Sequence, residues 1–575
     1  MSTVEAMATA DAAEAGGRTK SSSPRTIPVI GVVTPHEDMQ GVFKPMDLNR
    51  IIKLLEENDK DDLEEKQLNS VMKMVHCYQN GFPLRDLAQV FKILGLCAEK
   101  IEKQPCFVEP ASDLIKLCGL PFLKKKVSDE ITYTEDTANS LALLGELMKI
   151  PSSKLRIQIC KCIVDFYHAE PPKKHIPGYQ QVSSSYKVKM AEVGGLAEAM
   201  VQSVLLIENQ LVEKLWVLKV LQHLSTSEAN CTLMVKAQAA GRICAHLNDP
   251  DPSGQLLFRS SEILWNLLEK SSKDEIIQQL SNLECLLALK EVFKNLFMRG
   301  HSHYDRQLRN DILVITTIIA QNPGAPMILL IDGKVILALL TYVKKPERLK
   351  IIEWSAAQYE ELQLHAIATL SSVAPLLIEE YMSCQGNARI LAFLEWCDHE
   401  DSFFIHGNSF HGTGGRGNKF AQMRYTLRLL RAMVYLEDET VNTDLCERGV
   451  IHQLIGIFKN MASKHDEKEE AIALEIQSDT LLILSGLCEH YIQWKEMFGT
   501  EGVDIILHVM KTDPKKLQSG LGYNVLLFST LDSIWCCILG CYTSEDYFLE
   551  KEGIFLLLDI LAKDLTAASL LIKLW

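Results

Sequence analysis

The stretch richest in residues typical of chemistry is the glycine-rich insert HGNSFHGTGGRGNK at residues 406–419. Gly412, Gly414 and Gly417 satisfy the G-x-G-x-x-G spacing, at which backbone amides cradle the phosphates of a dinucleotide. That function requires a strand before the loop and a helix after it. A helix is predicted from about Phe420, but the preceding segment is also helical and no alternating strand pattern lies nearby. The alternatives are a nucleotide site and a loop inserted between repeats, and the sequence favours the loop.

Two histidines form a second candidate. His301 and His303 stand close to Asp305, so they are possible metal ligands or acid–base groups. The simpler interpretation is a loop before a helix, with Asp305 as the helix cap. The sequence contains no H-E-x-x-H motif and no serine–histidine–aspartate order, and we predict no catalytic residue.

The 16 cysteines form a third candidate, and they are densest at Cys536, Cys537 and Cys541. Zinc would require a fourth ligand at a suitable spacing, and none stands nearby. Most of the cysteines fall on apolar helix faces, where a cysteine acts as a small hydrophobic residue. We therefore predict reduced thiols, no metal and no cofactor.

Three arginines, Arg424, Arg428 and Arg431, follow the insert at spacings of four and three. These spacings place them along one side of a helix, beside the apolar positions Met423, Leu427, Leu430 and Val434. The planar guanidinium group is suited to binding carboxylates. We therefore predict that these residues, the arginine strip, dock an acidic partner. The alternative is a solvated helix flank whose arginines pair with Glu437 or Asp438.

The insert and the arginine strip belong to a repeating cassette in which a glycine separates a partly polar run from an apolar helix start. The cassette glycines are Gly195, Gly241, Gly333, Gly386, Gly449, Gly502 and Gly553. One expected position has Glu284 instead. The last five glycines are 53, 63, 53 and 51 residues apart, and the longest interval contains the insert. We expect each glycine to join two helices through a positive φ or a close backbone approach.

Longer helical patterns lie between the cassettes, with apolar residues recurring at three and four. No such unit can bury its apolar face alone, so neighbouring units must stack. The repeat size indicates an all-α fold, an armadillo-like α-solenoid of the ARM/HEAT superhelix type. We divide the chain into a disordered N-terminal tail (1–40), an irregular helical region (41–186) and the armadillo-like repeats (187–575).

Composition narrows the class of function further. A net charge of −15 argues against nucleic-acid binding. No uninterrupted apolar segment has the length of a membrane span, and the N-terminus lacks the apolar core of a secretory signal. We therefore expect a cytoplasmic protein that acts through protein partners, with no nucleic acid, membrane or small-molecule substrate.

Several long stretches resemble the cilia- and flagella-associated protein 69 family, among them FKPMDLNRIIKLLEE, LRIQICKCIVDFYHAEPPKKHIPGYQQ and LGYNVLLFSTLDSIWCCILGCYTSEDYFLEKEGIFLLLD. The similarity runs from about residue 41 to the end. It implies a non-enzymatic scaffold of the axoneme of cilia and flagella, of the central-apparatus type, with other axonemal proteins as partners. It also implies roles in sperm flagella and olfactory cilia.

The sequence departs from the family at two places. The family is longer between NPGAPM and LLIDGK, near residue 328, and it continues beyond LLIKLW. We therefore expect a shortened or alternatively spliced form. The competing interpretations are a nucleotide-binding protein that uses the insert and a soluble armadillo-like adaptor of the cytoplasm.

Overall fold

The structure is a computed structural model, and it describes residues 46–57, 63–168, 176–207, 210–298, 305–320, 334–344, 356–398, 419–462, 470–513 and 522–563. Residues Asp47–Trp575 form one compact unit. The described residues are almost entirely helical, as predicted. Their strands are β1 (Leu123–Lys124) and β2 (Gln180–Gln181), which pair antiparallel. The predicted tail at 1–40 lies outside the described residues.

The N-terminal part contains the helices α1 to α7, and its first helix shows how directly the sequence specifies an element. Asp47 caps α1 by accepting a hydrogen bond from the amide of Arg50 at 3.2 Å. The buried face of α1 consists of Leu48, Ile51, Ile52 and Leu55, which recur at the spacing of three and four typical of an amphipathic helix. The helices here are α1 (Leu48–Glu56), α2 (Leu63–Cys77), α3 (Leu87–Lys100), α4 (Val108–Gly119), α5 (Asp129–Thr132), α6 (Thr134–Glu146) and α7 (Ser153–Asp165).

From α8 to α16 and from α20 to α27 the helices group in threes, each group ending in a long helix, if α26 is counted as two helices that meet at a kink at Gly499. The helices from α8 onward are α8 (Tyr186–Val193), α9 (Leu196–Ser203), α10 (Leu211–Leu224), α11 (Glu228–Lys236), α12 (Ala239–Ala245), α13 (Gln255–Lys270), α14 (Lys273–Leu280), α15 (Leu283–Met298), α16 (Asp305–Ala320), α18 (Val335–Tyr342), α19 (Ala356–Val373), α20 (Ile378–Ser383), α21 (Gly386–Asp398), α22 (Phe420–Val434), α23 (Glu439–Glu447), α24 (Val450–Ala462), α25 (Glu470–Cys488), α26 (Ile492–Lys511), α27 (Tyr523–Ser533), α28 (Tyr542–Glu550) and α29 (Gly553–Lys563).

Short helices complete the described elements. The 3₁₀ turns are η1 (Leu84–Asp86), η2 (Pro105–Phe107), η3 (Leu147–Lys149), η4 (Val204–Leu206) and η5 (Ala374–Leu376), and a π-helical turn, η8 (Ile534–Ile538), follows α27.

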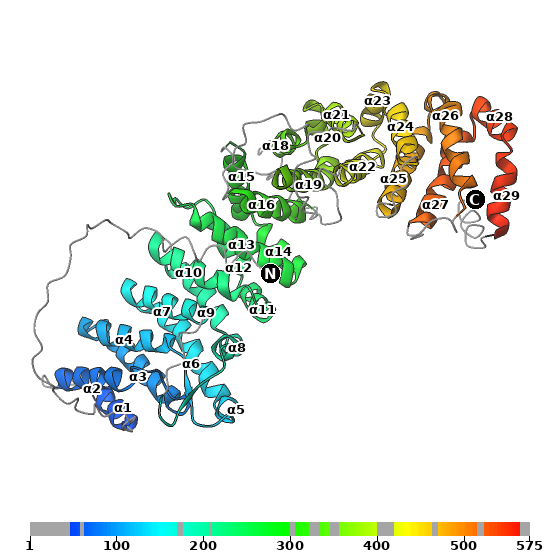
Figure 1. Cartoon of the computed structure of the whole chain (residues 1–575). Coiled ribbons are helices and arrows are strands. Elements are labelled where there is room, and N and C mark those ends of the chain that lie inside the picture. Colours follow the sequence, from blue (N-terminus) through cyan, green and yellow to red (C-terminus); the bar gives the residue numbers. More distant parts are fainter. Residues whose placement is uncertain are drawn as a thin grey trace, which may run out of the picture. The chain divides into compact units, whose positions relative to one another are not determined.

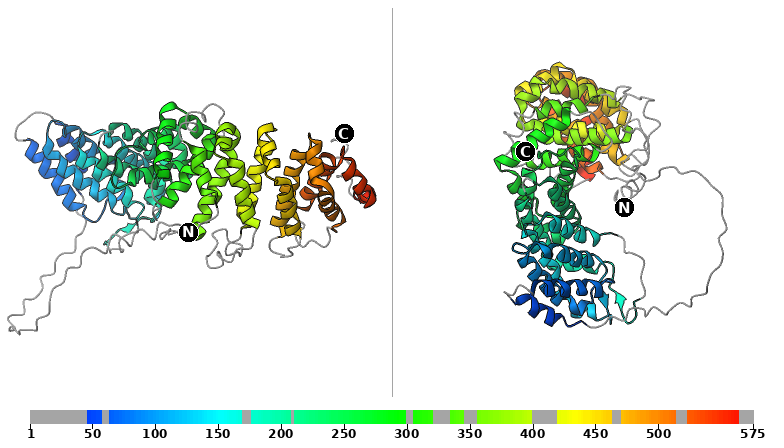
Figure 2. Two further views of the ribbon diagram at one scale, coloured as in Figure 1. Left: turned by 90° about the horizontal axis from the view of Figure 1, so that it is seen from above. Right: turned by 90° about the vertical axis from the view of Figure 1, so that its left-hand side faces the viewer.

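The long helices form the spine of the fold, because each packs against the next. The series runs α4, α7, α10, α13, α16, α19, α22, α25 and α27, and it can be followed by label in Figure 1 and by colour in Figure 2. Stacking of successive helical units in sequence order defines an armadillo-like α-solenoid. Since α7 contacts α10 directly, packing continues across the predicted division between residues 186 and 187. The division itself stays an interpretation of the sequence.

Polar side chains tie successive long helices together inside the stack. Arg156 of α7 donates from Nη1 to Oε2 of Glu213 in α10 at 3.1 Å, and both side chains are buried. Further ties are Gln222–Glu262 (2.6 Å), Thr317–Thr369 (2.8 Å), Ser478–Ser529 (2.6 Å) and Ser485–Ser533 (3.0 Å). Hydrogen bonds are directional, so these ties fix how each helix sits against its neighbour, which apolar packing alone does not.

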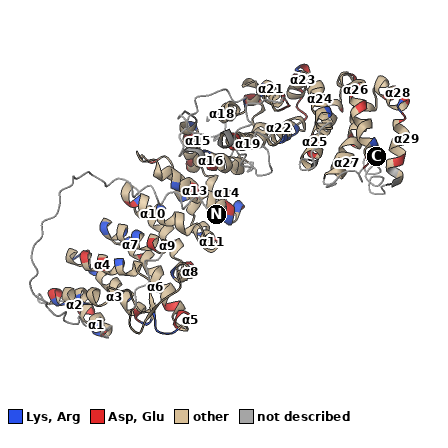
Figure 3. Cartoon of the chain, viewed as in Figure 1, with Lys and Arg blue, Asp and Glu red and all other residues tan. Residues whose placement is uncertain are grey.

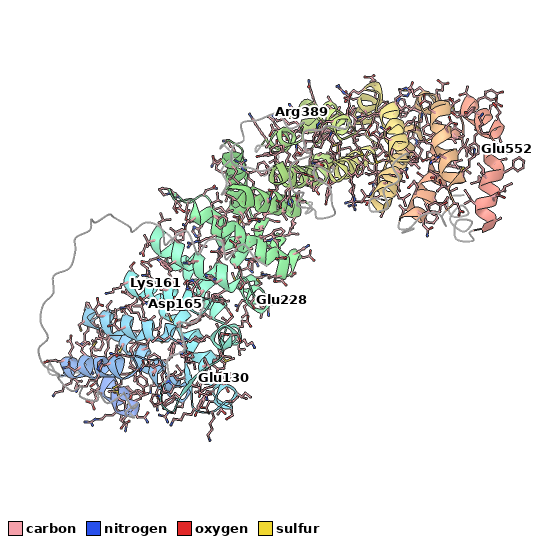
Figure 4. The ribbon with its side chains drawn as sticks, in the orientation of Figure 1. Glu130, Lys161, Asp165, Glu228, Arg389 and Glu552 are labelled. Atoms are coloured by element: carbon pink, nitrogen blue, oxygen red, sulfur yellow. The ribbon has the colours of Figure 1, made fainter. Side chains whose placement is uncertain are left out.

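Most turns between the first and second helix of a unit contain one residue with positive φ. These residues are Gly195, Gln238, Lys334, Gln385, Gly449, Gly499 and Glu552, and Glu552 is labelled in Figure 4. The turn from α14 to α15 has none. There Asn282 accepts a hydrogen bond from the amide of Cys285 at 2.8 Å and starts α15 as a cap. The cassette therefore marks the turns correctly, but glycine fills the left-handed position in only some of them.

Three cassette glycines serve the other predicted purpose, a close approach. A Cβ on Gly386 would stand 2.3 Å from the ring of Tyr381, and on Gly502 or Gly553 it would stand 2.4 Å from the ring of Phe498 or Phe548. The second helix thus begins directly on an aromatic side chain of the first. Gly333 lies outside the described residues.

Candidate partner-docking surface

The arginine strip lies where α22 packs against α25, the next long helix. The guanidinium groups of Arg424 and Arg428 both bind the carboxylate of Glu475, at 2.7 and 2.5 Å. Arg431 donates to Oδ1 of Asp479 at 2.6 Å. Glu475 and Asp479 are four residues apart on α25, so the two helices present matching rows of opposite charge.

The ion pairs between the arginine strip and Glu475 and Asp479 form a charge ladder between α22 and α25. The two carboxylates of this ladder differ in their surroundings. The side chain of Glu475 is 31% exposed, whereas that of Asp479 is 6% exposed. Burial works against ionisation of Glu475, but its two arginines outweigh burial and lower its pKa. For Asp479, burial outweighs Arg431 and the pKa is raised. The ionised form of Asp479 therefore depends on Arg431 more than the ionised form of Glu475 depends on either of its two arginines.

The predicted alternative partners, Glu437 and Asp438, are not the ones used. Glu437 has a φ of 54° in the turn after α22, and Asp438 caps α23 by accepting from the amides of Thr440 and Val441 at 3.0 Å. The chain reverses after Val434, so these acids serve the next helix. Glu475 could not be identified from the sequence because it lies 47 residues beyond Arg428.

The arginines keep part of their surface free in spite of this pairing. Their side chains are 33, 41 and 40% exposed in sequence order. Arg428 also lies over the ring of Tyr425, with 5.6 Å between Cζ and the ring centroid. Figure 3 shows blue positions on α22. The arginine strip thus links two repeats through ion pairs, and part of each guanidinium side chain is still exposed to solvent. Its role in docking stays a prediction.

The sequence interpretation missed a set of exposed apolar residues close to the ends of the last long helices. They are Leu376 (44% exposed), Tyr435 (52%), Ile492 (60%) and Trp535 (49%). Tyr435 follows the arginine strip on α22, and its ring lies 3.7 Å from where a Cβ on Gly486 of α25 would stand. Each residue lies just outside or at the edge of an apolar helix pattern, where periodicity alone does not distinguish core from surface.

The other chemical candidates have different outcomes. The insert at 406–418, His301 and His303 lie outside the described residues, and α16 begins at Asp305. Lys419, the last residue of the insert, is described, and its ammonium group donates to the carbonyl of Trp396 at 2.9 Å. The two alternatives for the insert, a nucleotide site and a loop inserted between repeats, therefore both stay sequence predictions.

The cysteines of the densest group are buried. Cys536 and Cys537 lie in the π-helical turn, and burial raises the pKa of Cys536 to about 12. Cys541 contacts the hydroxyl of Thr543 at 3.4 Å. Within the described ranges, no three side chains among histidine, cysteine, aspartate and glutamate come together in a way suited to a metal ion.

One helix of the described part, Ala471–Cys488 within α25, is long and apolar enough to cross a membrane by length and composition. In the stack, 67% of that window is buried, and α22, α24 and α27 cover it. The same helix carries Glu475 and Asp479 of the charge ladder. Its apolar character is therefore that of a core helix enclosed by its neighbours.

Triplets of helices, a left-handed turn residue in most of them and a continuous spine of long helices together define the class of this protein: it is an armadillo-type helical repeat protein. A family profile described as "Cilia- and flagella-associated protein 69, ARM repeat" matches residues 46–329 and 327–573. The chain belongs to this family.

Two relatives illustrate the similarity. The chain is 78% identical to cilia- and flagella-associated protein 69 of Mus musculus and 73% identical to that of Homo sapiens. Each comparison covers 100% of this chain and 71% of the relative. The expected resemblance is confirmed, and the chain is shorter than these relatives.

The alignment with the mouse protein also shows that this chain is shorter within the aligned region. The alignment with the mouse protein spans 666 residues, whereas this chain has 575, so about 90 aligned positions have no residue here. The two profile matches meet at 327–329, close to residue 328, where the family was expected to be longer.

Among solved structures, a chain from a structure of Kap95p with RanGDP covers 90% of this chain, and the match spans 54% of its own length. Its identity is 12% and its TM-score 0.46.

Proposed function

We propose that the chain is a non-enzymatic scaffold of the axoneme of cilia and flagella, of the central-apparatus type. Its family membership supports the ciliary role, and the continuous spine of long helices supports the scaffold. A stack of repeats offers extended surfaces to partners along its length. In this proposal the partners are other axonemal proteins, and the chain supports assembly and motility of sperm flagella and the function of olfactory cilia.

A ciliated cell line that expresses the tagged chain tests this function. After detergent extraction, a scaffold of the axoneme remains with the microtubules and lies along the central pair in immuno-electron microscopy. Crosslinking followed by mass spectrometry then identifies the axonemal neighbours. A chain that leaves with the detergent-soluble cytoplasm would instead be a cytoplasmic adaptor.

The nucleotide-binding alternative has a separate test. A ligand present at a hundredfold its Kd stabilises a folded protein by about 2.7 kcal/mol. We expect ATP and NAD to leave the melting temperature of the chain unchanged. A saturable rise with either nucleotide, absent after deletion of residues 406–418, would establish the insert as a binding loop and overturn this part of the proposal.

Within the scaffold we propose that the arginine strip docks an acidic partner through the open edges of its guanidinium groups. Arg428→Gln is the mildest test, because Glu475 retains Arg424. The control is Arg389→Gln, which removes an exposed arginine of α21 outside the strip (Figure 4). Weaker crosslinking to one axonemal neighbour in Arg428→Gln alone supports docking. Equal crosslinking in both variants would leave the strip as a structural tie only.

A further inference from the structure

A polar hollow of about 640 Å³ lies between the turn from α11 to α12 and the helix α14 of the next repeat. These helices are adjacent in Figure 1, and Glu228, labelled in Figure 4, marks the start of α11. The lining of the hollow is dominated by charged and amide side chains, namely Lys236, Gln238, Arg242, Glu275, Gln278, Gln279 and Asn282. It is separate from α22, which carries the arginine strip, and from α25, which carries the carboxylates paired with the strip.

The two cations of the hollow have no carboxylate of their own. Neither Lys236 nor Arg242 lies within 4.0 Å of a carboxylate among the described residues. Arg242 is partly buried, and its Nη1 is covered by protein without a hydrogen-bond acceptor. A buried donor without a partner is costly in a folded protein. The hollow therefore holds a guanidinium group whose hydrogen-bonding capacity is not satisfied within the fold.

The wall of the hollow is fixed by a side chain that spans the two repeats. Gln279 of α14 donates from Nε2 to the carbonyl of Val235 at 2.8 Å and accepts from the amide of Ala240 at 3.1 Å. It thereby holds both sides of the turn around Gln238, whose φ is 63°. Asn282 donates to the carbonyl of Gln279 at 2.8 Å. Both walls are thus held in place, so a ligand meets a preformed site.

We infer that this hollow binds an acidic segment of a partner protein, with a glutamate or aspartate carboxylate received by Arg242 and Lys236. Neither cation has a carboxylate partner among the described residues, and the fork of an arginine matches the two oxygens of a carboxylate. The neighbouring amide side chains add donors. Glu275 is the one acid in the lining, so the cations outnumber the acids. On a chain of net charge −15, a local excess of cations orients an acidic partner here.

A fluorescein-labelled peptide of eight glutamates, titrated with the full chain and followed by anisotropy, tests the inference. We expect saturable binding that weakens as salt rises. Arg242→Gln and Lys236→Gln should each weaken it by about tenfold, the loss expected for one charge-assisted hydrogen bond. Glu275→Gln should tighten binding, because it removes the repulsive carboxylate.

Matched controls separate this site from general charge effects. Lys273→Gln removes an exposed cation of α14 outside the hollow and should leave affinity unchanged, as should Arg389→Gln in α21. If Arg242→Gln lowers the melting temperature, Lys236→Gln and Glu275→Gln still decide the question, because both residues are exposed. Equal binding in these two variants and the parent chain would overturn the inference. So would competition by inorganic phosphate at concentrations at which acetate has no effect, since the site would then select phosphate.

Discussion

The backbone of Gly386 lies against the ring of Tyr381, so that a β-carbon on residue 386 would stand 2.3 Å from Cε2 of the ring. Tyr381 is fully buried, which leaves its ring little room to move. We predict that Gly386→Ala lowers stability by about 2 kcal/mol, the range for an added methyl group in a packed core. Thermal unfolding followed by circular dichroism measures the effect.

The control for this prediction is Gly456→Ala in α24. Apart from the backbone of its own helix, no atom lies within 4 Å of the place that a β-carbon on Gly456 would take. Alanine there should raise stability by up to about 1 kcal/mol, since glycine is the poorer helix former. If Gly386→Ala lowers stability and Gly456→Ala raises it, packing against Tyr381 is the cause of the loss. Stabilisation by both would show that the ring moves aside.

The ladder between α22 and α25 predicts unequal effects from its arginines. Arg431→Gln leaves the buried carboxylate of Asp479 without its partner and should cost about 2 kcal/mol. Arg428→Gln should change stability by less than about 0.5 kcal/mol, because Glu475 is more exposed and keeps Arg424. Urea unfolding of both variants provides the comparison.

A double variant checks the physical cause. Adding Asp479→Asn to Arg431→Gln removes the unpaired charge, so part of the lost stability should return. If the double variant is as unstable as the sum of the two single variants, the two residues do not interact and the proposed tie is wrong.

The sequence predicted best those features that depend on neighbours along the chain. The cap of Asp47 and the buried face of α1 follow from residues within one or two turns, and the cassettes marked where helices join. The partners of the arginine strip depend instead on how two repeats align, and Glu475 is 47 residues from Arg428. The hollow at Arg242 likewise arises only when α14 stacks on the preceding unit. Periodicity predicts that units stack, but it does not fix which side chains meet between them.

The thiols provide a test of the cysteine prediction. All 16 cysteines are unpaired in the structure, and Cys77 and Cys106 are the exposed ones. Cys106 donates to Glu64 at 2.7 Å, and partial burial together with this carboxylate raises its pKa to about 11. Since the thiolate is the reactive form, Cys77 should react first with a thiol reagent at pH 8, read by peptide mass spectrometry. After denaturation without reductant, 16 thiols should titrate and elemental analysis should find no stoichiometric zinc.

Glu64→Gln separates the carboxylate from burial as the cause of slow reaction. It should accelerate modification of Cys106 and leave Cys77 unchanged. A count below 16 in the denatured protein would instead reveal disulfides, and one zinc per chain would point to a metal site that uses residues outside the described ranges.

Two buried acids of the long helices, Asp311 in α16 and Glu360 in α19, predict a pH dependence of stability. Burial raises the pKa of each to about 7. For Asp311, a hydrogen bond from Gln307 at 2.7 Å works in the opposite direction and Glu262 adds to the rise. Between about pH 4 and pH 7 the folded chain therefore binds more protons than the unfolded chain, so these acids make stability fall as pH rises through that window.

Removing the titrating group should remove this fall. Asp311→Asn keeps an oxygen acceptor for Gln307, and Glu360→Gln keeps the size of the side chain. Relative to the parent chain, each variant should gain about 2 kcal/mol more at pH 8 than at pH 5, measured by urea unfolding at both values. Asp274→Asn, at an exposed position of α14, should show no such difference. A variant that is equally stable relative to the parent at both pH values would mean that Asp311 and Glu360 ionise normally in the folded chain, with water reaching their carboxyl groups.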